Sequence, residues 1–178
     1  MAIKKGAKKS AKKGSRRVVV AVSGGFDPIH IGHVRMFEHA RALGDELVVI
    51  LNNDNWLNKK KGFAFMPEKE RKEVIEGLRA VDRVVLTKHK PNDPDMSVSK
   101  ALQTVKPDVF ANGGDRKFDN IPEVAVCEKI GCAMVFNVGK GGKIQSSSWL
   151  LKKHFDRKAK VAPPKKVRDS APKILKRY

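Results

Sequence analysis

The sequence has 178 residues, of which 40% are hydrophobic, and its formal net charge at pH 7 is +19. This length and hydrophobic content suit one globular domain with a core of its own. No apolar run is long enough to span a membrane, and no apolar stretch follows the basic residues at the start, as a secretory signal peptide requires. We therefore expect a cytoplasmic protein without a membrane span.

The positive charge is concentrated at the two ends of the chain. Residues 1–17 carry eight Lys and Arg and no acidic residue, and residues 152–178 carry eleven Lys and Arg and two Asp. These ends hold 17 of the 19 net charges, so the segment between them carries only +2. A nucleic-acid-binding domain carries its basic residues on its folded surface. The distribution favours a nearly neutral domain at 18–153, flanked by basic disordered tails at 1–17 and 154–178.

Between the tails, strand-like and helix-like patterns alternate. Val18–Val22 predicts a strand buried on both faces, and Ile31–Leu43 predicts a helix that ends at Gly44. The remaining predicted elements are, in chain order, a strand at Glu46–Leu51, a helix opened by Pro67, a strand at Arg83–Leu86, a helix at Val98–Val105, a strand at Asp108–Ala111, a helix at Pro122–Ile130, a strand at Ala133–Val138 and a helix from Ser146 through Lys153. This alternation predicts an α/β fold with a parallel five-stranded sheet and helices on both faces.

The loop after the first predicted strand carries the residues best suited to catalysis. Gly24 and Gly25 let the backbone approach a ligand closely, and His30 and His33 lie three residues apart at the start of a predicted helix. Both imidazoles can therefore point toward one anion, beside the free amides of the helix N-terminus. This arrangement suits phosphoryl transfer, in which the protein holds and neutralises charge on phosphorus. A surface turn with two incidental histidines is the alternative, and the position after a buried strand argues against it.

Residues 25–33 read GFDPIHIGH, which resembles the signature of the cytidylyltransferase-like nucleotidyltransferases. The resemblance implies a Rossmann-like fold and transfer of a nucleoside monophosphate from ATP or CTP to a phosphorylated small molecule, with release of pyrophosphate. It implies that His30 and His33 stabilise the α-phosphate during in-line attack. Gly24, Gly25 and Phe26 are then expected to face the nucleotide phosphates. Mg²⁺ is expected to arrive with the nucleotide, and we assign the protein no metal ligands of its own.

Lysines and an arginine after the second predicted strand also match the family. A lysine in a mobile loop contacts the triphosphate in similar enzymes, and Lys60 and Lys61 are the candidates. We take Lys61 as catalytic and Lys60 as nucleotide-binding, although the sequence alone does not separate them. A solvated lysine loop is the open alternative. Arg71, four residues after Pro67, matches a family arginine and is assigned to acceptor binding.

Two further segments follow later strands and complete the match. Asp115 and Arg116 follow the fourth predicted strand, and we assign Asp115 to the nucleotide and Arg116 to the acceptor. Ser146, Ser147 and Ser148 follow the fifth strand and resemble a family motif that binds nucleotide phosphates through hydroxyls and helix amides. A simple helix N-cap is the alternative for these serines. Asp27 is interpreted as structural, holding the turn around the histidines.

Within the family, these segments are most similar to the sugar-phosphate branch, with heptose 1-phosphate adenylyltransferase first and glycerol 3-phosphate cytidylyltransferase next. The expected acceptor is therefore a sugar phosphate, and the resemblance leaves a homodimer open. The competing function is a polyanion- or nucleic-acid-binding protein that acts through its basic tails, and weak non-specific binding of this kind can coexist with catalysis. Cys127 and Cys132 are expected to be reduced thiols, as in a reducing compartment. A zinc site is not expected, because no second Cys/His pair lies at zinc-ligand spacing.

Overall fold

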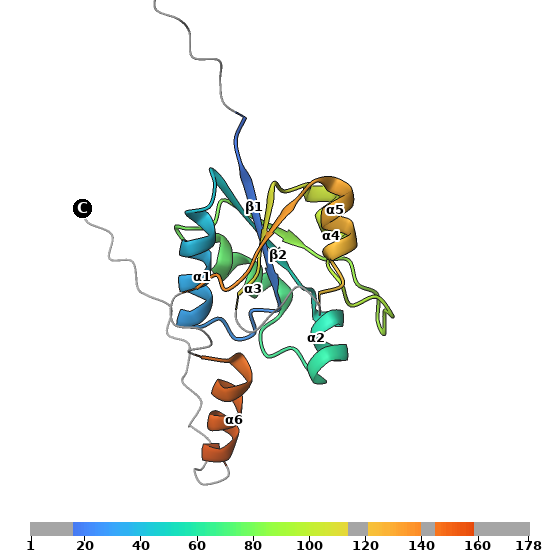
Figure 1. The fold of residues 1–178 in the computed structure, drawn as a ribbon. Coiled ribbons are helices and arrows are strands. Elements are labelled where there is room, and N and C mark those ends of the chain that lie inside the picture. The colour runs from blue at the N-terminus through green and yellow to red at the C-terminus, as the bar shows by residue number, and fades with distance from the viewer. Residues whose placement is uncertain (1–15, 114–120, 140–144, 159–178) are drawn as a thin grey trace, which may run out of the picture.

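The computed structural model describes residues 16–113, 121–139 and 145–158. In this part of the chain, five strands and six helices alternate (Figure 1). The strands are β1 (Val19–Gly24), β2 (Glu46–Leu51), β3 (Arg83–Leu86), β4 (Val109–Ala111) and β5 (Ala133–Val135). The helices are α1 (Ile31–Arg41), α2 (Asp54–Lys61), α3 (Glu68–Glu76), α4 (Ser99–Val105), α5 (Val124–Ile130) and α6 (Ser147–Lys158).

The sheet is parallel throughout and its strand order is β3-β2-β1-β4-β5. The order reverses at β1, since β2 lies on one side of it and β4 on the other. In an open parallel sheet, this reversal leaves a crevice beyond the carboxyl ends of the two central strands. The predicted α/β, Rossmann-like five-stranded sheet is confirmed.

Alternate residues of the central strand face two separate apolar layers. Val20 joins a core with Phe37 of α1 and Ile75 of α3, whereas Ala21 joins a second core with Leu102 of α4. Figure 1 shows α1 on one side of the sheet and α4 with α5 on the other. The continuous apolar run of β1 therefore reflects burial on both faces, as expected for a central parallel strand.

Residues 54–61 form helix α2, where the sequence predicted a mobile loop. The side chain of Asn53 caps this helix by accepting a hydrogen bond from the Trp56 N–H at 3.1 Å, and Gly62 ends it with a φ of 85°. Leu57, on the inner face of this helix, is fully buried. The prediction was wrong because α2 has a single turn of apolar residues, and the three lysines of its last turn resemble a solvated loop.

The last helix is longer than predicted. α6 begins at Ser147 and continues through Lys158, five residues beyond the expected domain end at Lys153. At the other end, Arg16 lies in the predicted tail, yet its Nη2 atom contacts Asp108 Oδ1 at 2.7 Å. Residues 1–15 and 159–178, the bulk of both predicted disordered tails, lie outside the described residues.

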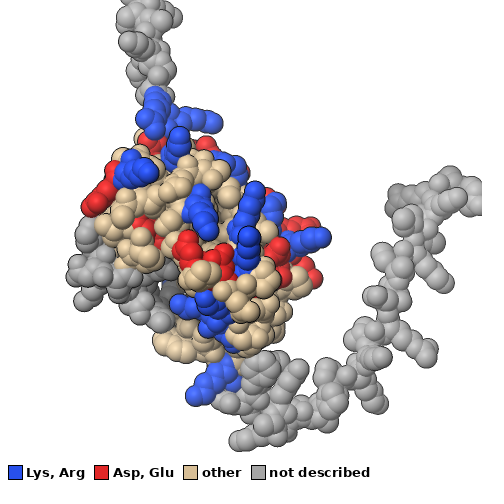
Figure 2. Space-filling model, turned by 90° about the vertical axis from the view of Figure 1, so that its right-hand side faces the viewer, with Lys and Arg blue, Asp and Glu red and all other residues tan. Residues whose placement is uncertain are grey.

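The described surface carries charges of both signs. Figure 2 views the molecule from the α4 and α5 side and shows Lys and Arg interspersed with Asp and Glu. None of the helices within the described ranges combines the length and apolar character needed to cross a lipid bilayer. Cys127 and Cys132 are buried as free thiols, and burial raises the pKa of Cys132 to about 12.

Candidate active site

His30 and His33 stand together at the N-terminus of α1, beyond the carboxyl end of β1. His30 is the N-cap residue, and its Nδ1 atom accepts a hydrogen bond from the Gly32 N–H at 3.1 Å. The two imidazole rings are stacked, with their centroids 3.6 Å apart and their planes 22° apart. Because Nδ1 of neutral His30 accepts, its ring proton lies on Nε2 and remains available as a donor. The structure thus brings together the two histidines that the sequence singled out.

His33 connects this pair to the hydrophobic core. Its ring meets the edge of Phe26 at a centroid distance of 4.9 Å, and Phe26 in turn meets Phe37 at 5.0 Å. Burial, followed by the charges of His30 and Lys61, lowers the pKa of His33 to about 3. Its Nδ1 atom is buried without a hydrogen-bond partner among the described residues. A buried unpaired nitrogen is destabilising, which is typical of positions where function sets the geometry.

The three lysines at the end of α2 point to three different places. Lys59 Nζ donates to the Asp93 carbonyl at 2.5 Å, and Lys60 Nζ lies 5.5 Å from the centroid of the Trp56 ring. Lys61 Nζ instead donates to the carbonyl of Asp27 at 3.0 Å, within the histidine loop. Only Lys61 of these three is therefore directed to the histidine loop.

The charge of Lys61 acts on the histidines. Burial is the main cause that lowers the pKa of His30, and the Lys61 ammonium lowers it further. Burial also lowers the pKa of Lys61 itself, against the opposing effect of the Asp27 carboxylate. The site is consequently a cluster of two imidazoles and one ammonium, and the positive charge of Lys61 favours an anion there.

Asp27 holds a second loop against the histidine loop. Its carboxylate is fully buried and accepts hydrogen bonds from the N–H groups of Phe65 and Met66, at 2.7 and 2.8 Å. These residues belong to the segment between α2 and α3. The structural role expected for Asp27 is confirmed, and it extends across to the next loop.

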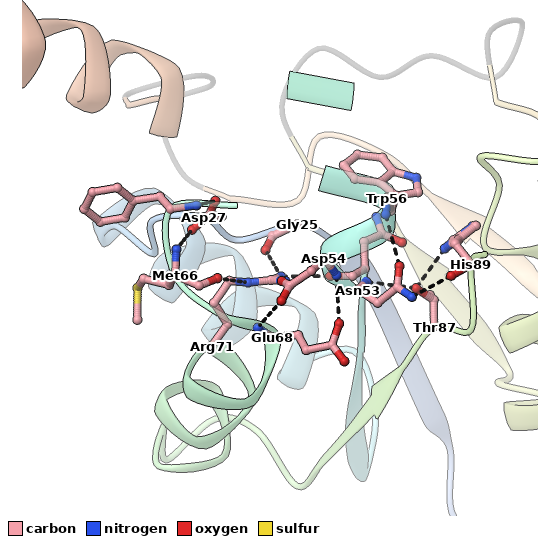
Figure 3. Close-up of polar contacts among 12 residues, drawn as sticks. Gly25, Asp27, Asn53, Asp54, Trp56, Met66, Glu68, Arg71, Thr87 and His89 are labelled. Atoms are coloured by element: carbon pink, nitrogen blue, oxygen red, sulfur yellow. Dashed lines mark hydrogen bonds and ion pairs between the residues drawn. The ribbon is translucent and has the colours of Figure 1, made fainter. Parts of the chain in front are cut away.

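Arg71 lies beneath the site and joins three loops (Figure 3). Its guanidinium donates to the carbonyls of Gly25, Asn52 and Met66 at 2.7 to 2.9 Å and pairs with Asp54 Oδ1 at 2.6 Å. The side chain is fully buried. The sequence assigned Arg71 to acceptor binding, but the structure commits four of its five N–H donors to the protein, so it braces the loops around the site from within.

Close packing explains the glycines of the histidine loop. A Cβ atom on Gly24 would lie 2.8 Å from the Phe26 ring, and one on Gly25 would lie 2.8 Å from the Leu57 side chain. The Phe26 side chain is only 5% exposed, so it fills the core while its backbone adopts a left-handed φ of 47°. A side chain at either glycine would therefore force the Phe26 ring or the Leu57 side chain to move.

The serine segment reaches the histidine loop from the far end of the chain. Ser147 Oγ donates to the Pro28 carbonyl at 2.9 Å and is largely buried, whereas Ser148 is exposed. Ser146 directly precedes α6, and its carbonyl accepts the first helical hydrogen bond, from Leu150 N–H at 3.1 Å. Asp115 and Arg116 lie outside the described residues.

A polar loop at residues 87–97 lies beside α2 and was not anticipated from the sequence. Thr87 and His89 are buried in it, and both line a cavity of about 200 Å³ between this loop and α4. No side-chain pattern in the sequence marks this loop, because it bonds to α2 mainly through its backbone carbonyls. No group of three or more His, Cys, Asp or Glu within the described ranges is arranged to hold a metal ion.

Sequence comparison places this site in a family. The profile described as cytidylyltransferase-like matches residues 21–136, which include the histidine loop, α2 and Arg71. The chain belongs to the cytidylyltransferase-like family. It is a nucleotidyltransferase. Similar curated proteins include the FAD synthase of Pyrococcus abyssi, 41% identical over 107 residues that cover 60% of this chain and 69% of the relative. The FAD synthase of Thermoplasma acidophilum is 33% identical over 138 residues, which cover 76% of this chain and 93% of the relative.

Solved structures agree with this assignment. The lipopolysaccharide core biosynthesis protein from Thermoplasma volcanium superposes with a TM-score of 0.57 at 30% identity and covers 68% of this chain and 95% of its own. Thermotoga maritima TmcAL bound with alpha-thio ATP has the same TM-score at 13% identity, covering 79% of this chain and 51% of its own. The second likeness supports the fold alone.

Proposed function

We propose that this nucleotidyltransferase transfers the adenylyl group of ATP to FMN, forming FAD and pyrophosphate. The observation that carries the proposal is the similarity to proteins named FAD synthase, one of which is covered over 93% of its length. FAD is FMN joined to AMP through a phosphoanhydride, so FMN is a phosphorylated small-molecule acceptor. The acceptor class predicted from the sequence is retained, with a flavin phosphate in place of a sugar phosphate.

The site geometry supports direct in-line transfer. A phosphate oxygen of FMN attacks the α-phosphorus of ATP. The bond between that phosphorus and the oxygen that bridges the α- and β-phosphates breaks, and pyrophosphate leaves with the electrons of this bond. His30 Nε2–H and the Lys61 ammonium are donors suited to the charge that develops on the α-phosphate oxygens. Mg²⁺ would arrive with ATP, held by phosphate oxygens and water, and would neutralise the departing pyrophosphate.

The remaining residue assignments are part of the proposal. Lys60, Ser146, Ser147 and Ser148 serve the nucleotide phosphates, together with the backbone of the histidine loop. Asp115 serves the nucleotide and Arg116 the acceptor. Arg71 acts on the acceptor only through the loops that it braces. A cytoplasmic location, a homodimer and weak polyanion binding by the tails also stay proposals.

A sugar phosphate is the second candidate acceptor. It is favoured by the 30% identity to a structure titled as a lipopolysaccharide core biosynthesis protein. That title indicates carbohydrate chemistry, and the sequence resemblance led to the same branch. The two candidates differ in the acceptor alone, so one assay separates them.

The test is a matrix of ATP, CTP, GTP and UTP against FMN, glycerol 3-phosphate and heptose 1-phosphate. Pyrophosphate release is measured, and the nucleotide product is identified by mass spectrometry. We expect the highest kcat/KM for ATP with FMN, and loss of that activity when Mg²⁺ is chelated. A matched reaction with riboflavin, which lacks the attacking phosphate, should release no pyrophosphate. A preference for a sugar phosphate over FMN would establish the second candidate instead.

A further inference from the structure

A chain of hydrogen bonds runs from the start of α2 into the 87–97 loop. The Asn53 N–H donates to Thr87 Oγ1 at 3.0 Å, and Thr87 Oγ1 lies 2.9 Å from His89 Nδ1. On the other side of the ring, His89 Nε2 lies 3.0 Å from the Ser97 carbonyl. All the side chains in this chain are buried, and Figure 3 shows the contacts of His89 and Thr87 with Asn53.

The chemistry of these groups gives the chain one direction. The Ser97 carbonyl can only accept, so the proton of the neutral imidazole lies on Nε2. Nδ1 of His89 must then accept from the Thr87 hydroxyl, whose oxygen accepts from Asn53. His89 thereby ties the first and last residues of the loop together and fixes the orientation of the Thr87 hydroxyl.

The loop held in this conformation forms hydrogen bonds with α2 along the length of the helix. Asn53 and Asn55 both donate from their side-chain amides to the His89 carbonyl, at 2.8 and 2.9 Å. The Trp56 indole N–H donates to the Met96 carbonyl at 2.8 Å, and Lys59 donates to the loop as described above. Four residues from the N-cap to the last turn of α2 therefore bond to backbone oxygens of one loop. Because backbone oxygens move with the loop, the loop sets the position of the helix.

The position of α2 matters because its last residue reaches the site. Lys61 Nζ bonds to the histidine loop, while the N-terminal end of α2 is also held by the ion pair of Asp54 with Arg71. The Arg71 attachment fixes the first turn only. Nearer the last turn, which carries Lys61, Leu57 packs in the core and Lys59 bonds to the 87–97 loop, so this loop contributes to the placement of Lys61.

We propose that His89 is a positioning residue for nucleotidyl transfer: its ring holds the 87–97 loop in the conformation that seats α2 and so places Lys61 beside His30 and His33. This inference rests on the proposed role of Lys61 at the nucleotide phosphates. His89 itself has both ring nitrogens bonded within the protein and acts through α2. Small displacements of a group that meets the transition state are costly, since a shift of about 1 Å can lower a rate by about 100-fold.

The first test is a double-mutant cycle on kcat with saturating substrates. We expect His89→Ala to lower kcat by about 10-fold or more, and to change it less than about twofold when Lys61 is already replaced by Met. Thr87→Val should reproduce the loss because it breaks the same chain, whereas Thr87→Ser keeps the hydroxyl and should retain activity. Thr104→Val, at an exposed threonine whose hydroxyl bonds within α4, is the matched control and should have no effect. A loss at His89 that persists in full beside Lys61→Met would overturn the inference.

The second test does not depend on activity. Since the Lys61 charge contributes to the lowered pKa of His30, movement of Lys61 away from the loop should raise that pKa. NMR titration of the His30 ring protons should show a rise in His89→Ala and in Lys61→Met, and no added rise in the double variant. An unchanged His30 pKa in His89→Ala, alongside a raised one in Lys61→Met, contradicts the positioning role. If FMN is not the acceptor, this titration still decides the inference, while the substrate matrix decides the function.

Discussion

Burial lowers the pKa of both histidines and of Lys61 in the candidate site. Burial is the main cause that lowers the pKa of His33, to about 3, and of His30, and the positive charge of Lys61 lowers both further. Burial also lowers the pKa of Lys61, where the added repulsion comes from Arg71 and Lys60. At neutral pH both imidazoles are therefore neutral donors rather than cations. Neutral N–H donors stabilise developing charge without binding the triphosphate so tightly that the ground state is favoured equally.

The first prediction concerns the two histidines as transition-state donors. Replacing His30 or His33 by Ala should lower kcat by about 100-fold or more, within the range for losing one such donor. The measurement is pyrophosphate release with saturating substrates. Nucleotide binding, followed by calorimetry with a non-hydrolysable ATP analogue, should change much less. Near-normal turnover in the His33→Ala protein would refute the mechanism.

The second prediction is a dependence of stability on pH that originates at His33. Its pKa falls from 6.5 to about 3 on folding. Between these values the unfolded chain binds a proton that the folded protein does not, so stability falls as the pH decreases from about 6.5 toward about 3. Thermal unfolding between pH 7 and 4 should therefore show a shallower loss of Tm in His33→Asn than in the parent. His39→Asn is the control, and parallel curves for His33→Asn and the parent would exclude this origin.

The third prediction concerns the buried guanidinium of Arg71. Lysine cannot reproduce its four hydrogen bonds, so Arg71→Lys should lower the free energy of unfolding by about 2 kcal/mol, the cost of leaving buried carbonyls unpaired. Urea denaturation measures the change. Arg79→Lys makes the same substitution at an exposed position and should leave the free energy of unfolding unchanged. An Arg71→Lys protein as stable as its parent would mean that the loops are held by other contacts.

At the scale of elements, α6 closes the site by a contact between distant parts of the chain. Ser147 Oγ bonds to the Pro28 carbonyl across 119 residues of sequence. The helix otherwise projects beyond the sheet (Figure 1), so this contact fixes its first turn against the histidine loop. The N-terminus of α6 therefore lies beside the histidine loop.

The fourth prediction tests that attachment. Ser147→Ala should weaken the docking of α6 by about 1 kcal/mol, and hydrogen exchange of the Leu150 amide, which bonds to the Ser146 carbonyl, should accelerate about fivefold. The exposed Ser148→Ala is the matched control for exchange. Equal exchange in both variants would show that the hydroxyl of Ser147 does not hold the helix.

The sheet and its flanking helices were predictable, and α2 was not. Long apolar runs such as Glu46–Leu51 report burial on both faces, and their boundaries agree with the structure. α2 has its polar residues in contact with loop backbone, so no apolar stripe marks it. The contact of α2 with the 87–97 loop could not be predicted for the same reason. Asn55 and Trp56 bond to backbone carbonyls of the loop, and any residue type can supply a backbone carbonyl.

The residues of the candidate site that lie together in one short segment could be predicted from the sequence. His30 and His33 lie in a short motif whose geometry follows from a strand, a turn and a helix start. Lys61 could not be separated from Lys60, because the choice depends on the rotation of α2. Arg71 could not be recognised as a buried brace, since an arginine on an amphipathic helix has the same sequence signature whether it faces solvent or the protein.

At the scale of the molecule, the charge distribution predicts that catalysis and any polyanion binding belong to different parts of the chain. Most of the net charge lies in the predicted tails, while the described surface mixes both signs (Figure 2). Lysine-rich arms bind phosphate backbones by releasing counterions, without reading sequence. The two activities should therefore be removable one at a time.

The fifth prediction follows from that separation. The full chain should bind DNA weakly, with an affinity that falls by orders of magnitude between low and moderate salt. A chain of residues 16–158, which keeps α6 and the Arg16 contact, should lose this binding and retain its turnover. Salt titrations of binding and kcat measurements on both chains provide the readout. Equal DNA affinity in the shorter chain would place the binding surface on the folded domain.

Phe26 makes His33 an outer member of the hydrophobic core. Its buried ring makes T-shaped contacts with both His33 and Phe37, so a continuous series of aromatic contacts runs from the middle of α1 to the site. Protein cores pack as densely as organic crystals and transmit small changes of shape. A substitution at Phe26 or Phe37 that changes core packing should consequently also shift the His33 ring, so stability and turnover are coupled at these three rings.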